Sequence, residues 1–223
     1  MKNRIWELDF VRGVAITFVV IFHTLYDMQY IYRYHLPFSW QWLTHLAGIF
    51  ILIAGICAPF SRSNIKKGLI LSGMAIAITI GTYIYDKYFF IQFGILHLLA
   101  FCMLTYPLFK RLSNLTLAII SVVVMTVGMF LNNSVCPFPH LYILGWADAS
   151  YQSMDWFPIM PYVAYFTIGI LISRCVYERR ETIFKGKQPL ITKPFSFIGR
   201  YTLWVYLLQQ PITLAVLELL SKK

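Results

Sequence analysis

The chain has 223 residues, of which 59% are hydrophobic and only 13% are charged. This composition excludes an ordinary soluble domain and indicates a polytopic membrane protein, with one all-α transmembrane helix bundle over residues 1–223. The formal charge of +10 is high enough for a nucleic-acid partner, but the basic residues flank apolar segments. We therefore interpret them as topology signals and expect a lipid bilayer, not nucleic acid, as the partner.

Apolar segments of about twenty residues, which cross about 30 Å of hydrocarbon, predict seven transmembrane helices. In chain order they are Ile5–Tyr32, Trp42–Phe60, Gly68–Tyr85, Phe89–Phe109, Leu115–Leu131, Phe157–Val176 and Phe195–Leu220. This layout places most of the 19 Lys and Arg residues on one side, and only Arg33, Lys87, Lys222 and Lys223 on the other. Because cytoplasmic loops carry the excess of positive charge, we expect a cytoplasmic N-terminus and an external C-terminus.

The first predicted helix carries ionisable residues along one face. At 100° per residue, one line is formed by Asp9, Arg12, His23 and Asp27. Arg12 lies near the cytoplasmic end, and His23 lies about 16 Å further along the axis. Asp27 is one turn beyond His23, where the two side chains can touch. Such groups are costly at membrane depth and usually serve a function. Two simpler interpretations stay open: His23 bonds to a neighbouring helix, and Asp9 only pairs with Arg12.

Further polar side chains at membrane depth lie on the fourth and seventh predicted helices, and are Gln92, His97, Tyr206, Gln209 and Gln210. We expect Gln92 and His97 to face the interior of the bundle, and Tyr206, Gln209 and Gln210 to offer hydrogen-bond donors or acceptors to substrate. An interhelical hydrogen bond is the alternative for His97. Pro211 should kink the last helix.

A long predicted outer loop begins at Asn132 and contains no Lys or Arg. Its aromatic residues predict a surface for a sugar or a lipid headgroup. Asp155 and Trp156 are expected to begin the sixth helix on that side and to contact a sugar. Asp155 has an alternative role as a favourable partner of the helix dipole.

The cysteines are spaced too widely for a metal site, and we expect none at Cys57, Cys102, Cys136 and Cys175.

Five segments in chain order resemble the bacterial heparan-alpha-glucosaminide N-acetyltransferase-like family. They are RIWELDFVRGVAITFVVIFHTLYD from Arg4, GIFILIAG from Gly48, QFGILHLLAF from Gln92, DWFPIMPYVAYFTIGI from Asp155 and IGRYTLWVYLLQQPI from Ile198. The spacing from Arg12 to His23 also resembles the membrane acyltransferase type 3 family, and both belong to one transmembrane acyltransferase superfamily. One departure is that the family often has His-Gln-Pro where this chain has Gln209-Gln210-Pro211.

The resemblance implies a multi-pass enzyme of the bacterial cytoplasmic membrane that modifies glycans of the cell envelope. It would move an acyl group, typically acetyl, from cytoplasmic acyl-CoA to a hydroxyl or amine of a carbohydrate or lipid-linked glycan acceptor. The donor is acetyl-CoA and no metal is implied. The resemblance also allows a homodimer.

Acyl transfer needs a base, oxyanion donors and a site for CoA. We expect His23 to be the base and Asp27 to orient it. By resemblance His35, in YRYHLPFSW, is a rival. Residues expected to hold CoA are Asp9, Arg12, Arg200, Gln92 and His97. Residues expected to contact the acceptor are Tyr206, Gln209, Gln210, Asp155 and Trp156.

The alternative function is a proton-coupled transporter that relays protons through His23, Asp27 and His97. The chain has no inverted repeat, which many transporters have, so the acyltransferase is preferred. A non-catalytic scaffold is a third interpretation. The sequence leaves open the acceptor, O- versus N-acylation, the length of the acyl chain and the oligomeric state.

Overall fold

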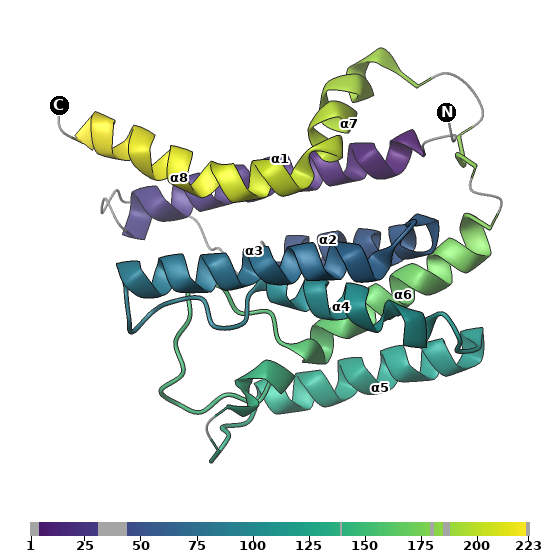
Figure 1. Ribbon diagram of the computed structural model, residues 1–223, viewed down its shortest axis with the longest axis horizontal. Helices are drawn as coiled ribbons and strands as arrows, with labels where there is room; N and C mark the ends of the chain where they lie inside the picture. The colour runs from purple at the N-terminus through teal and green to yellow at the C-terminus, as the bar shows by residue number, and fades with distance from the viewer. Residues whose placement is uncertain (1–4, 31–43, 139, 179–180, 185–187, 222–223) are drawn as a thin grey trace. The chain divides into compact units, whose positions relative to one another are not determined.

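The computed structural model describes residues 5–30, 44–138, 140–178, 181–184 and 188–221 (Figure 1). Within these ranges the chain is helical, and its regular elements include no strand. The α-helices are α1 (Trp6–Tyr30), α2 (Thr44–Cys57), α3 (Asn64–Tyr85), α4 (Ile95–Phe109), α5 (Asn114–Asn132), α6 (Ile159–Val176), α7 (Lys193–Arg200) and α8 (Thr202–Ser221). Short 3₁₀ helices lie at Ala58–Phe60, Leu141–Leu144 and Leu190–Thr192. The predicted all-α class is therefore confirmed.

The chain forms two compact units. The first unit contains residues 1–50 and 179–223, and the second contains residues 51–178. Helix α2 contributes to both. The single transmembrane domain predicted for residues 1–223 stays a prediction.

Several helices are long and apolar enough to cross a membrane. Among the described residues these are Trp6–Gln29, Asn64–Tyr85, Asn114–Asn132, Ile159–Val176 and Thr202–Leu220. Helices α2 and α4 are also apolar but have only 14 and 15 residues, which is short for a span. Each of the seven predicted segments contains a helix, so the protein is a multi-pass membrane protein. The count of seven crossings and the side of each terminus stay predictions.

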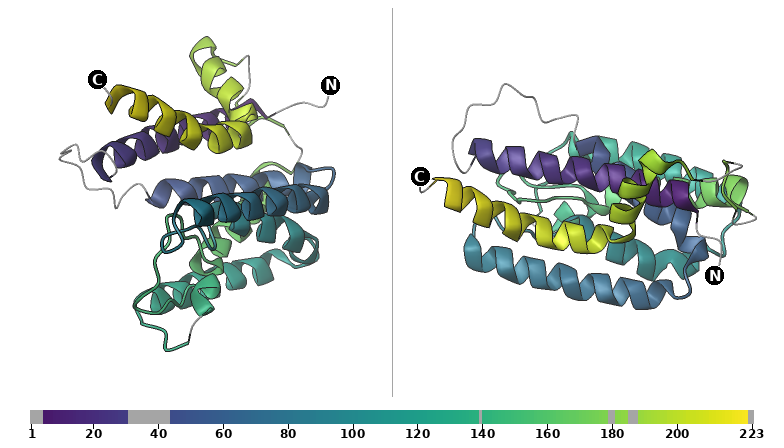
Figure 2. Two further views of the ribbon diagram at one scale, coloured as in Figure 1. Left: turned by 60° about the vertical axis from the view of Figure 1, so that its left-hand side comes forward. Right: turned by 90° about the horizontal axis from the view of Figure 1, so that it is seen from above.

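The seventh predicted helix, Phe195–Leu220, is wrong as one continuous element. It consists of α7 and α8, which are separated at Tyr201, where φ is −108° and ψ is 18°. The Tyr201 amide donates to Ile198 O at 3.0 Å, and the Thr202 hydroxyl donates to Gly199 O at 2.7 Å. These bonds satisfy carbonyls at the end of α7 and let the chain change direction. In the first unit, α8 then runs beside α1 in the same direction (Figure 2).

The fourth predicted helix, Phe89–Phe109, begins six residues late, at Ile95. The preceding loop is held by Asp86, whose carboxylate accepts from the amides of Tyr88 and Phe89 at 2.8 and 3.2 Å. Gln92 therefore lies in a loop and not on the helix.

The sixth predicted helix also begins later than expected, at Ile159 in place of Phe157. Asp155 and Trp156 consequently precede α6 and do not form its first turn.

In the second unit, α3 packs on α4 and α5 packs on α6. The α5–α6 contact contains a buried hydrogen bond of 2.7 Å between the Ser121 and Thr167 hydroxyls. At the end of α6, the Arg174 guanidinium donates to the carbonyls of Phe109, Lys110 and Leu112. Arg174, expected only as a topology signal, thus satisfies carbonyls where α4 ends.

Candidate active site

The buried side of α1 is the line of residues predicted from its periodicity. Asp9 and Asp27 are each only 4% exposed, and Ile16 between them is 0% exposed. On the opposite side of the helix, Phe18 and Ile21 are 45% and 49% exposed. The apolar face is suited to lipid, so the acidic groups are directed towards protein.

Two glutamines of α8 contact the outer half of this line. Gln209 Nε2 and His23 Nδ1 lie within hydrogen-bonding distance, and Gln210 Nε2 donates to Asp27 Oδ2 at 2.8 Å. The expected His23–Asp27 pair is not formed by a hydrogen bond among the described residues. Each of these two side chains is oriented by α8 and not by its neighbour on α1.

The Gln209 carboxamide fixes which form of His23 is favourable. If its nitrogen donates to Nδ1, the imidazole carries its proton on Nε2; if its oxygen accepts from Nδ1–H, Nε2 keeps its lone pair. Gln209 is only 7% exposed, and its Oε1 has no hydrogen-bond partner within the part of the chain that the structure describes. A buried polar atom without a partner is costly. Whichever atom of the carboxamide does not face Nδ1 therefore offers a binding point for a substrate group beside His23.

The position of Gln209 follows from the pattern of α8. Residues 209, 213 and 217 are buried, at 7%, 9% and 8% exposure, whereas Leu208 and Ile212 are 53% and 57% exposed. The spacing of four residues places Gln209 on the face that packs against α1. Helix α8 continues through Pro211. Tyr206, one turn before Gln210, is half-buried.

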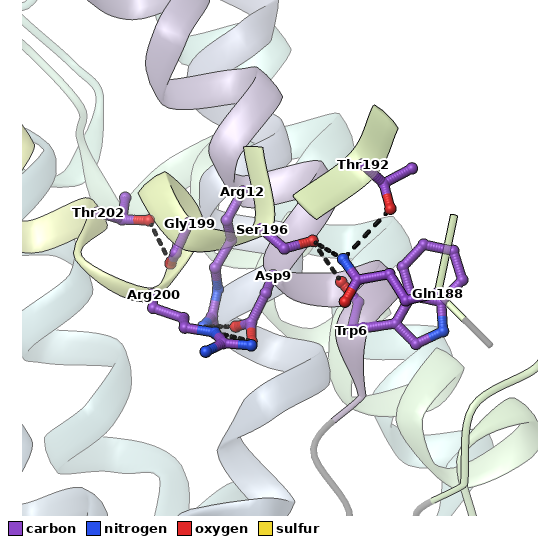
Figure 3. A network of polar contacts seen from close by, with 9 residues as sticks. All are labelled: Trp6, Asp9, Arg12, Gln188, Thr192, Ser196, Gly199, Arg200 and Thr202. Carbon is purple, nitrogen blue, oxygen red and sulfur yellow. Dashed lines mark hydrogen bonds and ion pairs between the residues drawn. The ribbon is translucent and has the colours of Figure 1, made fainter. Parts of the chain in front are cut away.

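The N-terminal half of α1 holds a cluster of charges, drawn in Figure 3. Asp9 pairs with Arg12 of α1 and with Arg200 at the end of α7, each at 3.8 Å. The Asp9 side chain is only 5% exposed, whereas those of Arg12 and Arg200 are 28% and 44% exposed. One buried carboxylate thus orients two accessible guanidiniums. The net charge of the three groups is positive, which suits the phosphates of CoA.

Helices α1 and α7 meet through two glycines. A Cβ on Gly199 would collide with the carbonyl oxygen of Asp9, and a Cβ on Gly13 would collide with that of Phe195. Only hydrogen at these positions permits the close approach. This contact places Arg200 next to Asp9.

A neutral hydrogen-bond network continues from this contact (Figure 3). Gln188 donates to the hydroxyls of Ser196 and Thr192 at 2.7 and 3.2 Å, and Ser196 donates to Trp6 O at 3.4 Å. Sequence reasoning missed this network. The nearest signal was the short spacing of polar residues in QPLITKPFS.

Glu7 also has a structural contact. Its Oε1 accepts from the Ile183 amide at 2.7 Å. The carboxylate therefore attaches the segment before α7 to α1.

His97, in the second unit, uses both ring nitrogens locally. Nδ1 accepts from the Gly94 amide at 3.2 Å, and Nε2 lies 3.2 Å from Thr79 Oγ1. The Thr79 hydroxyl donates to Ile91 O at 2.8 Å, so towards His97 it accepts. The ring thus stabilises the start of α4 and joins it to α3. This is the interhelical hydrogen bond that the sequence allowed as the alternative role of His97. A role of His97 or Gln92 towards CoA stays a prediction.

Asp155 caps the start of α4. Its Oδ2 accepts from the Ile95 amide at 3.0 Å, as an acidic group at a helix N-terminus is expected to do. The indole of Trp156 donates to Tyr142 O at 3.0 Å. Both side chains are thereby held in the loop that precedes α6.

The first unit therefore brings together His23, Asp27, Gln209 and Gln210 at one level of α1, and Asp9, Arg12 and Arg200 at another. His35 lies outside the described residues. Within the described ranges, no three His, Cys, Asp or Glu side chains are grouped to hold a metal ion.

Comparison with known proteins identifies the family. Residues 4–211, nearly the whole chain, match the sequence profile of heparan-alpha-glucosaminide N-acetyltransferase, catalytic. No curated protein and no solved structure matches the chain. The match confirms the family expected from the five segments. The chain belongs to the heparan-alpha-glucosaminide N-acetyltransferase catalytic family, a family of membrane acetyltransferases.

Proposed function

We propose that the protein moves an acetyl group from cytoplasmic acetyl-CoA to a hydroxyl or amine of a glycan or related envelope molecule outside the bacterial cytoplasmic membrane. The observation that carries the proposal is the contact of His23 with Gln209 on the buried face of α1. This contact holds the imidazole of His23, which can exchange a proton, in a fixed position on a membrane helix. The family match supplies the class of reaction.

His23 is the proposed general base. With the Gln209 carboxamide turned so that Oε1, in place of Nε2, faces Nδ1–H, the lone pair of His23 Nε2 takes the proton of the acceptor hydroxyl or amine. The acceptor oxygen or nitrogen forms a bond to the thioester carbonyl carbon. The carbon–sulfur bond then breaks, and the CoA thiolate leaves with the proton that His23 had taken from the acceptor, which returns the imidazole to its neutral form. His35 remains the rival base, because the resemblance places it in a corresponding segment.

Asp27 and Gln210 form the second part of this arrangement. The amide of Gln210 holds the Asp27 carboxylate at 2.8 Å, and Asp27 is one turn from His23 on the same face. A carboxylate at that distance favours a positive charge on the imidazole as the proton arrives. Asp27 therefore acts on the base through charge and not through a direct hydrogen bond.

The charge cluster of Asp9, Arg12 and Arg200 is the proposed site for the phosphates of CoA. Two guanidiniums recognise phosphate oxygens with several N–H donors each. Arg12 lies about 16 Å from His23 along the axis of α1, a distance that the pantetheine arm of CoA can span.

The transporter alternative is less favoured. It required His97 as a member of a proton relay with His23 and Asp27. Both ring nitrogens of His97 bond to Gly94 and Thr79, which supports a structural role. The acetyltransferase proposal needs no such relay.

The experiment uses the purified protein in lipid nanodiscs with radiolabelled acetyl-CoA, and with glucosamine and envelope glycan fragments as acceptors. His23→Ala should lower acetyl transfer by about 10²–10⁴-fold, the usual contribution of a general base, and leave the Kd for acetyl-CoA unchanged. His140→Ala is the matched control, since His140 is exposed in a loop. The same measurement on His35→Ala shows whether the rival base, His35, contributes to the rate of acetyl transfer.

Arg200→Gln provides the second measurement. It should weaken acetyl-CoA binding and leave the pH profile of transfer unchanged. Transfer at the native rate by both His23→Ala and His35→Ala would refute a histidine base. A folded protein that transfers acetyl to no acceptor, yet moves protons across vesicles without acetyl-CoA, would support the transporter.

A further inference from the structure

The second unit contains a cavity of about 470 Å³ that plays no part in the chemistry described above. It lies where the end of α5 meets the loop before α4 and the segment before α6. Its volume falls within the range of about 300–1,000 Å³ that is typical of small-molecule sites. The residues that matter for recognition are Phe89, Asn132, Asp148, Tyr151, Gln152 and Trp156.

The wall of the cavity is held by hydrogen bonds between two loops distant in sequence. The Met154 amide donates to Phe89 O at 3.3 Å, and the Ser153 hydroxyl donates to Phe90 O at 3.1 Å. The Phe157 amide donates to Phe93 O at 3.0 Å. These bonds attach the loop after α3 to the segment before α6. The cavity is therefore formed by fixed backbone, which reduces the entropy cost of binding.

One side of the cavity is aromatic. The rings of Tyr142 and Tyr151 are stacked with centroids 4.7 Å apart, and Trp156 lies 5.3 Å from Tyr151. The indole N–H of Trp156 is already bonded to Tyr142 O. Trp156 therefore contributes an apolar ring face held in a fixed orientation, and not a hydrogen-bond donor.

The cavity is also lined by polar groups, and among the described lining residues one is charged. Asn132 and Gln152 provide amides, and Asp148 provides a carboxylate. Asp148 Oδ1 accepts from the Ser150 amide and the Ser150 hydroxyl. These hydrogen bonds lower the pKa of Asp148 below its ordinary value, so it is ionised at neutral pH.

The charge of the cavity excludes one class of ligand. Among the residues that the structure describes, no lysine or arginine lines it, and the sequence of residues 132–156 contains neither. Phosphates and carboxylates would meet Asp148 without a compensating cation. The ligand must therefore be uncharged or cationic, with an apolar face for the aromatic rings and hydroxyls for the amides. A pyranose ring has this combination of surfaces.

We propose that this cavity binds one uncharged or amine-bearing sugar unit of the acceptor glycan, with the sugar ring against Trp156 and Tyr151. That the sugar belongs to an acceptor rests on the proposed acetyltransferase function. The binding itself does not, because every residue named for it lies outside the base and the charge cluster.

The test measures equilibrium binding of glucose, glucosamine and glucuronate in lipid nanodiscs prepared without glycoside detergents. The readout is ligand-observed NMR or tryptophan fluorescence. Glucose and glucosamine should bind more tightly than glucuronate. Trp156→Ala should weaken glucose binding about tenfold or more, and Trp156→Phe should retain part of it. Asp148→Asn should bring the affinity for glucuronate closer to the affinity for glucose.

Trp204→Phe is the control, because Trp204 is 57% exposed on α8 in the first unit. His23→Ala should bind glucose as the native protein does, so loss of transfer and loss of sugar binding are separable. A glycolipid in the nanodisc that displaces glucose would assign the sugar to a lipid-linked acceptor. The proposal is overturned if no sugar binds to the folded protein, or if Trp156→Ala and Asp148→Asn both bind all three probes as the native protein does.

Discussion

Replacing Gly199 by alanine tests whether the contact of α1 and α7 positions the CoA site. The new Cβ would lie 2.8 Å from the carbonyl carbon of Asp9 and 2.9 Å from the amide nitrogen of Gly13. Carbon atoms prefer a separation of about 3.5–4.0 Å, so α7 must move away from α1 by about 1 Å. The obstacle is backbone on both sides, which cannot rotate away as a side chain does.

The magnitude follows from two opposing effects. Overpacking of this kind costs about 1–3 kcal/mol. Alanine in place of glycine inside a helix regains about 0.5–1 kcal/mol. The net cost is at most about 2.5 kcal/mol, and at roughly 2–4 °C in Tm for each kcal/mol the loss is up to about 10 °C. Because Arg200 follows Gly199 directly, the displacement should also raise the KM for acetyl-CoA.

The assay is thermal unfolding in detergent together with the acetyl-CoA dependence of transfer. Gly73→Ala is the matched control, because a Cβ on Gly73 would meet no atom within 4 Å in α3. It should keep or raise the Tm and leave KM unchanged. Gly13→Ala should lower the Tm and raise the KM as Gly199→Ala does. The double variant should lose less Tm than the two single variants lose together, since both changes widen the same contact. Equal Tm and KM for Gly199→Ala and Gly73→Ala would refute the reasoning.

Other contacts give shorter predictions. Asp155→Ala should destabilise the protein by about 0.5–2 kcal/mol, the usual value of a helix N-cap, because the Ile95 amide loses its acceptor. Asp155→Asn keeps an acceptor oxygen and should lower the Tm less. Equal losses of Tm in both variants would show that Asp155 does not stabilise the start of α4 by this hydrogen bond. Arg174→Lys should have a Tm between those of the native protein and Arg174→Ala, since one ammonium cannot reach all the carbonyls that the guanidinium reaches. Thr79→Val should lower the Tm and leave the KM for acetyl-CoA unchanged; a raised KM at native Tm would instead place His97 in the CoA site.

The sequence predicted the parts of the fold that depend on local periodicity. The buried line of α1 through Asp9, Ile16 and Asp27 follows from 100° per residue, because a helix fixes the relative directions of its own side chains. The same geometry did not single out Gln209, whose burial is known only from the packing of α8. The family and the apolar helices followed from motifs in order and from hydropathy.

Tertiary partners could not be predicted in this way. Asp155 and Ile95 are 60 residues apart, and nothing near Asp155 distinguishes a cap for α4 from one for α6. The break at Tyr201 was missed because no proline lies between Pro194 and Pro211 to mark the end of a helix. Gly199 was the available signal, but a glycine indicates close approach only when the opposing backbone is known.

The two glutamines of α8 limit the chemistry that this arrangement can perform. A histidine beside His23 could share or pass on its proton, as the more usual His-Gln-Pro sequence of the family would permit. Gln209 can orient the imidazole through one hydrogen bond but can neither take nor supply a proton. In the proposed mechanism, proton transfer at this level of α1 therefore falls to His23 and Asp27 and not to residue 209. Gln209→His should accordingly add a second titrating group and change the pH profile of transfer. Gln209→Leu should lower the rate at every pH, because it removes only the orientation of the base. Identical pH profiles for native protein and Gln209→His would mean that residue 209 does not act through His23.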